Sequence, residues 1–317
     1  MITITRAPPY LTVQDDGRKR SRAAGVPRGG AMDRFALGAT NAVVGNALNA
    51  AVLEWGLAGG SLRFDADCTF AVGGAIAAIT LRDAPVAPFT TTQARAGDEI
   101  TVHQLESGRF LYVAFHGGID VPIVLHSRST YLPGGFGGHE GRVVRHGDVL
   151  GIAPPAGRAP DPGFHAPGEL TPAYTAAVVH VTRGPQADLF DESAWEAFLA
   201  SDFRVASASD RTGYRLEGAV IPNSAATLPS EAGCQGAIQV PGEGKPIVLM
   251  ADAPTVGGYP KIAVVSESDL PLMSQRQPGD SVRFELFTIE QSQRAARRRA
   301  SDLQTIRSLA ESSLRRV

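Results

Sequence analysis

The sequence predicts a mainly β protein built of two packed β-rich lobes, with few short helices and a C-terminal helix. Short apolar and β-branched runs recur along most of the chain, which is typical of strands. Gly (35) and Pro (22) are abundant, as tight turns between strands require. A Pro-rich stretch over residues 153–172 separates an N-terminal lobe (1–155) from a second lobe (173–290), and residues 291–317 follow as a helical tail.

Composition excludes several functional classes. Lys plus Arg total 30 and Asp plus Glu 32, so no global field favours nucleic acid or an anionic membrane. Cys68 and Cys234 are too few for a disulfide framework or a cysteine-based zinc site, and their surroundings indicate buried thiols. The seven histidines lack ligand spacing, so we expect no metal site. No stretch reaches the length of a membrane span and no signal-peptide pattern opens the chain, so we expect a soluble cytoplasmic protein.

The elements of the first lobe follow from its apolar pattern. Residues 2–4 alternate as a strand and residues 11–14 form a second short one. A glycine-rich loop then leads into one helix near 33–45, with Asp33 as its N-cap. Later runs bounded by Gly or Asp predict the strands of a barrel or sandwich: 52–55, 61–64, 69–72, 76–81, 99–102 and 109–115. Glu54 lies between apolar neighbours, and the sequence leaves open whether it points outward or is buried with a partner.

A polar segment of the first lobe is the first candidate for binding chemistry. Ser127, Arg128 and Ser129 precede a glycine-rich loop over residues 134–138. Hydroxyls and a planar guanidinium suit an oxyanion, although a polar turn packed on its own lobe would have the same sequence. The loop matches neither GxxxxGK[ST] nor GxGxxG, so we expect no ordinary nucleotide-binding loop. No GxSxG or HExxH motif occurs either.

The second lobe continues with short strands and one helix. Predicted strands cover residues 178–181, 237–240, 246–251, 262–265 and 282–286, the last as an edge strand, and a short helix covers 193–199. Residues 207–216 bring Asp210 and two arginines close to a glycine turn, which is also the pattern of a surface ion pair.

The turn Gly257-Gly258-Tyr259-Pro260-Lys261 is the second candidate for binding chemistry. Two glycines allow close approach to a ligand, and the proline fixes the angle at which Lys261 leaves the turn, so this cation is well placed to meet an anion. The alternative is a tight connection with a solvated lysine at a strand edge.

Several motifs together carry a resemblance to a known family. They are Gly30-Ala31-Met32-Asp33, Val44-Gly45-Asn46, Gly117-Gly118-Ile119-Asp120-Val121-Pro122, Ser127-Arg128-Ser129-Thr130-Tyr131, Gly236-Ala237-Ile238-Gln239-Val240-Pro241 and Gly257-Gly258-Tyr259-Pro260-Lys261-Ile262. In this order they closely resemble the biotin-dependent carboxyltransferase-like family, which includes the C subunit of 5-oxoprolinase (KipA) and the allophanate hydrolase subunit 2 domain of urea carboxylase. The resemblance covers about residues 1–290.

The resemblance implies a cyclophilin-like β-barrel in the second lobe. It also implies a role as the C subunit of an ATP-dependent 5-oxoprolinase complex, a hydrolase that opens 5-oxoproline (pyroglutamate) to glutamate together with an A subunit and a KipI-like B subunit. ATP would be used by the assembled complex. One alternative is a carboxyltransferase subunit that moves a carboxyl group from carboxybiotin, carried by another protein, to a urea-like or amide acceptor. Another is a KipA-type regulatory antagonist that binds a KipI-like kinase inhibitor.

Opening a lactam requires cations and hydrogen-bond donors against the developing negative charge, which guides the choice of site residues. We expect Lys261 to bind the anion and Asp210 and Asp252 to handle protons. The expected substrate-binding residues are Ser127, Arg128, Ser129, Gln239, Tyr259, Gly257 and Gly258. This hypothesis requires Lys261 to face the Ser127–Ser129 segment across a shared cleft.

Overall fold

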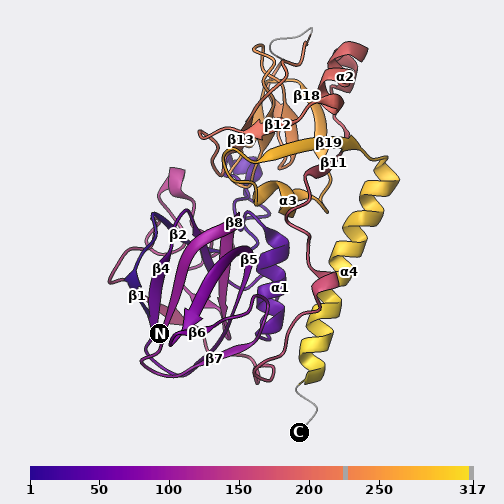
Figure 1. Cartoon of the computed structure of the whole chain (residues 1–317). Coiled ribbons are helices and arrows are strands. Elements are labelled where there is room, and N and C mark those ends of the chain that lie inside the picture. The colour runs from indigo at the N-terminus through magenta and orange to yellow at the C-terminus, as the bar shows by residue number, and fades with distance from the viewer. Residues whose placement is uncertain (224–227, 314–317) are drawn as a thin grey trace. The chain divides into compact units, whose positions relative to one another are not determined.

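The computed structural model describes residues 1–223 and 228–313, and the chain divides into two compact units (Figure 1). Unit 1 comprises Met1–Arg18, Gly29–Pro172 and the chain from Ala300 onward. Unit 2 comprises Lys19–Arg28 and Ala173–Arg299. The short segment between the first strands and the first helix therefore belongs with the second half of the chain, which the local sequence pattern did not indicate.

Unit 1 is built on an antiparallel sheet whose described strands number ten. The order along the sheet is β2-β3-β8-β4-β1-β10-β9, and β5 pairs with β6, β7 and β8. The strands are β1 (Ile2–Arg6), β2 (Tyr10–Gln14), β3 (Val52–Gly56), β4 (Gly60–Phe64), β5 (Cys68–Leu81), β6 (Ala84–Pro85), β7 (Thr92–Ala94), β8 (Glu99–Phe115), β9 (Ile119–Asp120) and β10 (Val149–Ile152). Short 3-10 helices, η2 (Leu132–Gly134) and η3 (Gly168–Leu170), lie in its loops.

Strands β5 and β8 correct the sequence-based expectation of four short strands. Residues 69–72 and 76–81 form one continuous strand, and residues 99–102 and 109–115 form another. The two pair with register shifts between Gly74 and Ile79, where extra residues are accommodated as bulges. Gly74 and Gly108 have φ of 94° and 81°, a backbone conformation that favours glycine. Glycines that we had taken as strand ends instead bend the strands.

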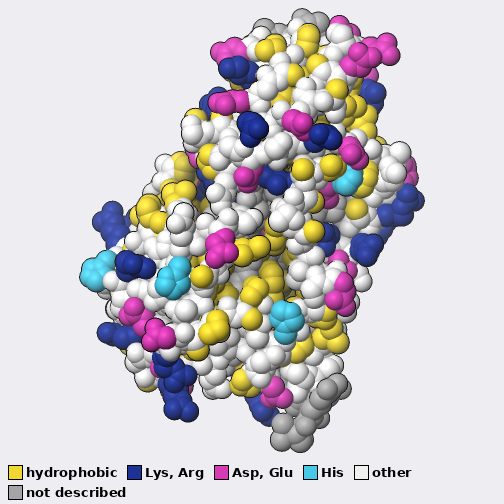
Figure 2. Space-filling view, viewed as in Figure 1, with side chains coloured by type: hydrophobic (Ala, Val, Ile, Leu, Met, Phe, Trp, Pro, Cys, Tyr) yellow, Lys and Arg dark blue, Asp and Glu magenta, His cyan; other side chains and the backbone are white. Residues whose placement is uncertain are grey.

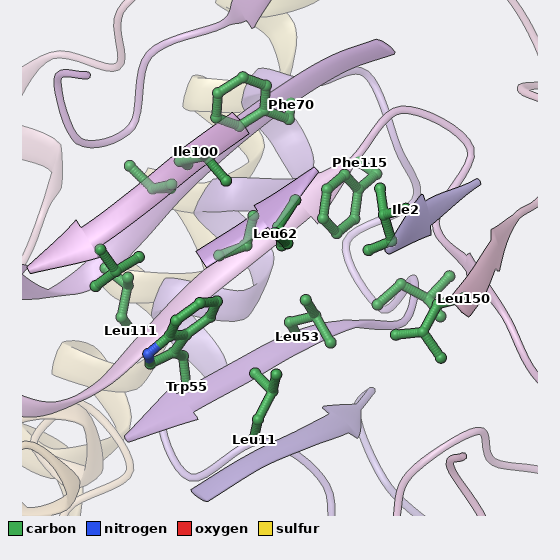
Figure 3. Packing of buried hydrophobic residues seen from close by; sticks show 14 of the residues in the cluster. Ile2, Leu11, Leu53, Trp55, Leu62, Phe70, Ile100, Leu111, Phe115 and Leu150 are labelled. Atoms are coloured by element: carbon green, nitrogen blue, oxygen red, sulfur yellow. The ribbon is translucent and has the colours of Figure 1, made fainter. Parts of the chain in front are cut away.

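The core of unit 1 lies against this sheet (Figure 3). Leu53 and Trp55 project from the same side of β3 into a cluster that includes Leu62 and Phe115, as the two-residue period of a strand requires. The buried indole of Trp55 donates to the carbonyl of Ala58 at 2.9 Å, so burying this large ring leaves no unpaired N–H. Each such side chain contributes roughly 1.5–3 kcal/mol through burial.

Helix α1 (Arg34–Val43) packs on β5 and β8 in unit 1 (Figure 1). The prediction of Asp33 as its N-cap is confirmed, because the Asp33 carboxylate accepts the Ala36 N–H at 2.8 Å. An added Cβ at Gly38 would lie 3.2 Å from Leu303 of helix α4 (Ile289–Ser313). A glycine at this point of α1 therefore allows the C-terminal part of α4 to lie close against it.

Unit 2 contains a closed barrel. Seven described strands follow the order β11-β18-β15-β16-β13-β12-β19, and the parallel pairing of β19 with β11 closes the ring. The strands of unit 2 are β11 (Val178–Arg183), β12 (Phe203–Val205), β13 (Gly213–Glu217), β14 (Glu231–Ala232), β15 (Ala237–Gln239), β16 (Ile247–Leu249), β17 (Val256–Gly257), β18 (Lys261–Val265) and β19 (Ser281–Leu286). The expectation that residues 282–286 form an edge strand is wrong, because β19 pairs on both sides.

The helices that lie wholly within unit 2 are short, while the first part of α4 also belongs to this unit. They are η1 (Arg22–Ala24), η4 (Ala187–Leu189), α2 (Glu192–Ala200) and α3 (Leu270–Ser274). Helix α2 covers the barrel through Phe198, which stacks on Phe284 of β19 at a centroid distance of 4.9 Å. The prediction of a mainly β protein with a barrel, few helices and a C-terminal helix is confirmed.

The distribution of surface charge agrees with the composition, whereas only one of the two cysteines is even partly buried. Positive and negative side chains are interspersed on the face shown in Figure 2, in keeping with the net charge of −2. Cys68 is partly buried, and burial raises the pKa of its thiol to about 11. The expectation of a buried thiol is wrong for Cys234, which is exposed in the loop before β15. Within residues 1–223 and 228–313, every helix is too short or too polar to cross a membrane.

Candidate functional site

The candidate site is a pocket of about 400 Å³ in unit 2. Strands β13, β15 and β16 and the turn before β18 supply its walls. Its lining residues are Ala208, Asp210, Thr212, Gly213, Arg215, Gln239, Ile247, Leu249, Pro254, Val256, Gly257, Gly258 and Tyr259. Apolar walls with a few polar groups, in a volume of this size, are typical of small-molecule sites.

Gln239 is the most constrained polar group of the pocket. The residue is only 7% exposed, and its carboxamide makes no hydrogen bond with another described residue. An added Cβ at Gly257 would lie 2.9 Å from Nε2 of Gln239, so the carboxamide rests directly on the glycine backbone. A buried carboxamide that has a donor and an acceptor unused is suited to a ligand.

Charged groups lie on the β13 side of the same pocket. The Asp210 Oδ1 atom accepts the N–H groups of Thr212 at 2.8 Å and of Gly213 at 3.3 Å, which tightens the turn before the strand. Arg215 is exposed and forms no ion pair with the part of the chain that the structure describes. Tyr259, 41% exposed, contributes a phenol from the opposite segment of the lining. The pocket thus offers a guanidinium, a carboxylate, a carboxamide and a phenol.

Lys261 does not line this pocket. It is the first residue of β18, its side chain is 3% exposed, and its ammonium donates to the Glu231 carboxylate. This hydrogen bond, more than any other effect, lowers the pKa of Glu231. Gln186 ties the pair together by donating to Glu231 at 2.7 Å and accepting the Lys261 backbone N–H at 3.2 Å. The alternative of a solvated edge lysine is therefore wrong, while the anion-binding role stays a prediction.

Asp252 is held in a buried ion pair. Arg211 donates to both of its oxygens, through Nε at 2.8 Å and Nη2 at 3.0 Å. Such a bidentate pair is strong and directional, and it joins the turn after β16 to the turn before β13. Asp252 lies outside the pocket lining, and its role in proton handling stays a prediction.

The Ser127–Ser129 segment lies in unit 1, where an aspartate that sequence reasoning missed organises it. Asp15 accepts the hydroxyls of Ser127 and Ser129, at 2.6 Å from Ser127, and the backbone N–H of Arg128 at 2.6 Å. Arg128 in turn donates to Asp120 at 3.1 Å. The internal-turn alternative accounts for these contacts, and whether the segment shares a cleft with Lys261 stays a prediction.

Glu54, whose direction the sequence left open, is buried and has partners. It accepts the hydroxyls of Tyr10 at 2.9 Å and Tyr112 at 2.8 Å, and the backbone N–H of Met32 at 2.8 Å. Burial and then the charge of Glu54 raise the pKa of Tyr112, which keeps its proton for this hydrogen bond. The network fixes the loop that leads into α1.

The pocket brings together five of the ten predicted site residues: Asp210, Gln239, Gly257, Gly258 and Tyr259. Sequence reasoning missed Arg215 and Thr212 as members of the site. The signal for Arg215 was present in the alternation of β13, where Tyr214 and Leu216 are buried and Arg215 between them faces outward.

Comparison with known proteins gives the family. The sequence model of the carboxyltransferase domain, subdomain A and B, matches residues 24–286. The chain is 37% identical over 296 residues to the 5-oxoprolinase C subunit of Escherichia coli (strain K12), covering 93% of this chain and 94% of that protein. It is 33% identical over 312 residues to the 5-oxoprolinase C subunit of Haemophilus influenzae, covering 98% and 99%.

Comparison of the fold with solved structures indicates the same family. The crystal structure of the Kluyveromyces lactis urea carboxylase matches with a TM-score of 0.89 and 31% identity over 98% of this chain. This chain spans 29% of that much longer one, so the likeness there is to one domain. The match over most of its length shows that the chain belongs to the family of the carboxyltransferase domain, subdomain A and B.

Proposed function

We propose that this chain is the C subunit of an ATP-dependent 5-oxoprolinase complex, which hydrolyses 5-oxoproline to glutamate with an A subunit and a KipI-like B subunit. The observation that carries the proposal is end-to-end similarity: the chain and the Escherichia coli C subunit match over 93% and 94% of their lengths. In this proposal the complex is cytoplasmic and ATP is bound and used by the assembled subunits.

The pocket of unit 2 is the proposed contribution of this chain to the reaction. Hydrolysis of a lactam places negative charge on the ring carbonyl oxygen, and fixed donors around that oxygen lower the barrier. Gln239 and Tyr259 supply such donors in one cavity, which also contains Arg215 as a cation for the substituent carboxylate and Asp210 as a carboxylate. Lys261, buried behind Glu231, is proposed to act only if another protein of the complex or the substrate replaces that carboxylate.

A carboxyltransferase is the second candidate, and the TM-score of 0.89 to the urea carboxylase favours it. In that function an amide or urea would occupy the pocket, and biotin would arrive on another protein. The carboxamide of Gln239 has the donor and acceptor that the ureido ring of biotin requires, so the residues present fit that group.

The test is reconstitution. The chain is co-expressed with the A and B subunits from the same genome, and 5-oxoproline, glutamate and ADP are measured with and without ATP. We expect glutamate only when the three proteins and ATP are all present. Lys261→Ala is assayed in parallel to test the predicted anion-binding role, with circular dichroism to verify folding.

Two results would contradict the proposal. A reconstituted complex that leaves 5-oxoproline intact would refute it. Avidin-sensitive carboxylation of urea or an amide, with a biotin carrier added, would instead establish the second candidate.

A further inference from the structure

We propose that Gln239 and Arg215 form a recognition site for a five-membered cyclic amide that carries a carboxylate. Naming 5-oxoproline as this ligand rests on the proposed function. The site itself is argued from the pocket, and it assigns substrate recognition to this component of the complex. Both residues line the same cavity of about 400 Å³, and both belong to unit 2.

The Gln239 carboxamide matches the edge of a lactam. In a five-membered lactam the ring holds the amide cis, so its N–H and its C=O lie on the same edge. A glutamine carboxamide presents an acceptor oxygen and a donor nitrogen side by side, and it can therefore form two parallel hydrogen bonds with that edge. An open-chain trans amide places these groups on opposite sides and would form only one.

Gln239 is prepared for this role in three respects. The residue is 7% exposed, so little water competes for its hydrogen bonds. Its carboxamide has no hydrogen-bond partner among the described residues, and neither polar atom is fully enclosed, so both can be reached from the pocket. The absence of a side chain at Gly257 leaves room for the carboxamide, because an added Cβ there would lie 2.9 Å from Nε2. A ligand that pairs with the carboxamide therefore meets a donor and an acceptor that no described protein group occupies.

Arg215 is the group that we propose binds the carboxylate of the ligand. Arg215 lines the pocket and forms no ion pair with any residue in 1–223 or 228–313, and arginine binds carboxylates with two parallel hydrogen bonds. The pocket's own carboxylate, Asp210, already accepts two backbone N–H groups through Oδ1. Ile247 and Leu249 of β16 supply the apolar part of the pocket wall, against which the ring methylenes can pack.

Four kinds of molecule present such an edge: a lactam amino acid, the ureido ring of biotin, urea and a primary amide. The guanidinium in the same small pocket favours the lactam amino acid, whose carboxylate is attached directly to the ring. Biotin on a carrier protein has no free carboxylate. Binding assays with 5-oxoproline and with a biotin ester therefore distinguish a lactam amino acid from the ureido ring of biotin.

The experiment measures binding to the full-length chain, alone and within the reconstituted complex, by equilibrium dialysis with radiolabelled 5-oxoproline. Unlabelled 5-oxoprolinamide, which lacks the charge, 2-pyrrolidinone, which lacks the whole substituent, and biotin methyl ester compete in separate arms. The variants are Gln239→Ala, Gln239→Glu and Arg215→Ala. Arg204→Ala is the matched control, because Arg204 is an exposed arginine of unit 2 that lies outside the pocket.

We expect Arg215→Ala to weaken 5-oxoproline binding about 10- to 100-fold and to leave 2-pyrrolidinone binding unchanged. Both Gln239 variants should weaken both ligands, Gln239→Glu because it loses the donor and repels the carboxylate. Arg204→Ala should bind as wild type. Folding of each variant is verified by its thermal melt, and the two Gln239 variants guard against a fold defect in either one.

The inference is overturned if wild type binds 5-oxoproline and the folded Gln239 and Arg215 variants bind it equally well. It is also overturned if neither the chain nor the complex binds it, or if biotin methyl ester displaces it more strongly than 5-oxoprolinamide. These outcomes are separate from failure of the proposed function: a complex that binds 5-oxoproline through this site but forms no glutamate would refute the function and leave the site.

Discussion

We predict that removing either partner of the Lys261–Glu231 ion pair lowers the free energy of unfolding by a different amount. The Lys261 side chain is 3% exposed and the Glu231 side chain 43%. Glu231→Ala leaves a buried ammonium with no other described partner, which costs about 1–3 kcal/mol of unfolding free energy. Lys261→Met keeps the length and shape of the buried chain and leaves a carboxylate that water can solvate, so it should cost less than about 1 kcal/mol.

The assay is urea denaturation monitored through the fluorescence of Trp195 in a Trp55→Phe background. Trp195 lies in unit 2 together with Lys261 and Glu231, whereas Trp55 lies in unit 1. Glu243→Ala, an exposed glutamate of the β15–β16 turn, is the control and should change stability by less than about 0.5 kcal/mol. Since the folded-state pKa of Glu231 is lowered, the difference between wild type and Glu231→Ala should shrink as pH falls through the carboxyl range. The reasoning is refuted if Lys261→Met is as destabilising as Glu231→Ala.

Three further predictions concern other sites. Asp148 has its pKa lowered to about 2, chiefly by hydrogen bonds from Arg142. Asp148→Asn should therefore cost up to about 2 kcal/mol near neutral pH, a difference that disappears as pH falls from about 4 to about 2 and that urea denaturation at several pH values measures. Gly257→Ala should displace the carboxamide of Gln239 and weaken 5-oxoproline binding about tenfold with little change in the thermal melt, whereas unchanged binding would show that the glycine contact is unimportant. Asp15→Ala removes the acceptor for two serine hydroxyls and should lower the unfolding free energy by about 2 kcal/mol, and equal stability would contradict its organising role.

Local pattern was enough to predict the fold class and most strands. The alternation of residues 2–4 and the Asp33 N-cap depend on neighbours within a few residues, and both are confirmed. The merging of four runs into β5 and β8 was not predictable, because a bulge depends on the partner strand. The closure of the barrel by β19 likewise depends on a pairing with β11, about a hundred residues earlier in the chain.

The site was predictable only in part for the same reason. Gln239 and Tyr259 were identified from motifs, and the pocket contains both. Arg215 was passed over because its sequence also fits a surface ion pair, and only the structure shows which arginine is paired: Arg211 binds Asp252, and Arg215 lines the cavity. Burial of Lys261 was equally invisible, since its partner Glu231 lies thirty residues away.

A crystal structure of the chain with bound 5-oxoproline tests the central claim most directly. The predicted result is a lactam in the unit 2 pocket, with its N–H and C=O hydrogen-bonded to the carboxamide of Gln239 and its carboxylate at Arg215. A lactam bound elsewhere on the chain, or in this pocket with its amide edge turned away from Gln239, would contradict the account.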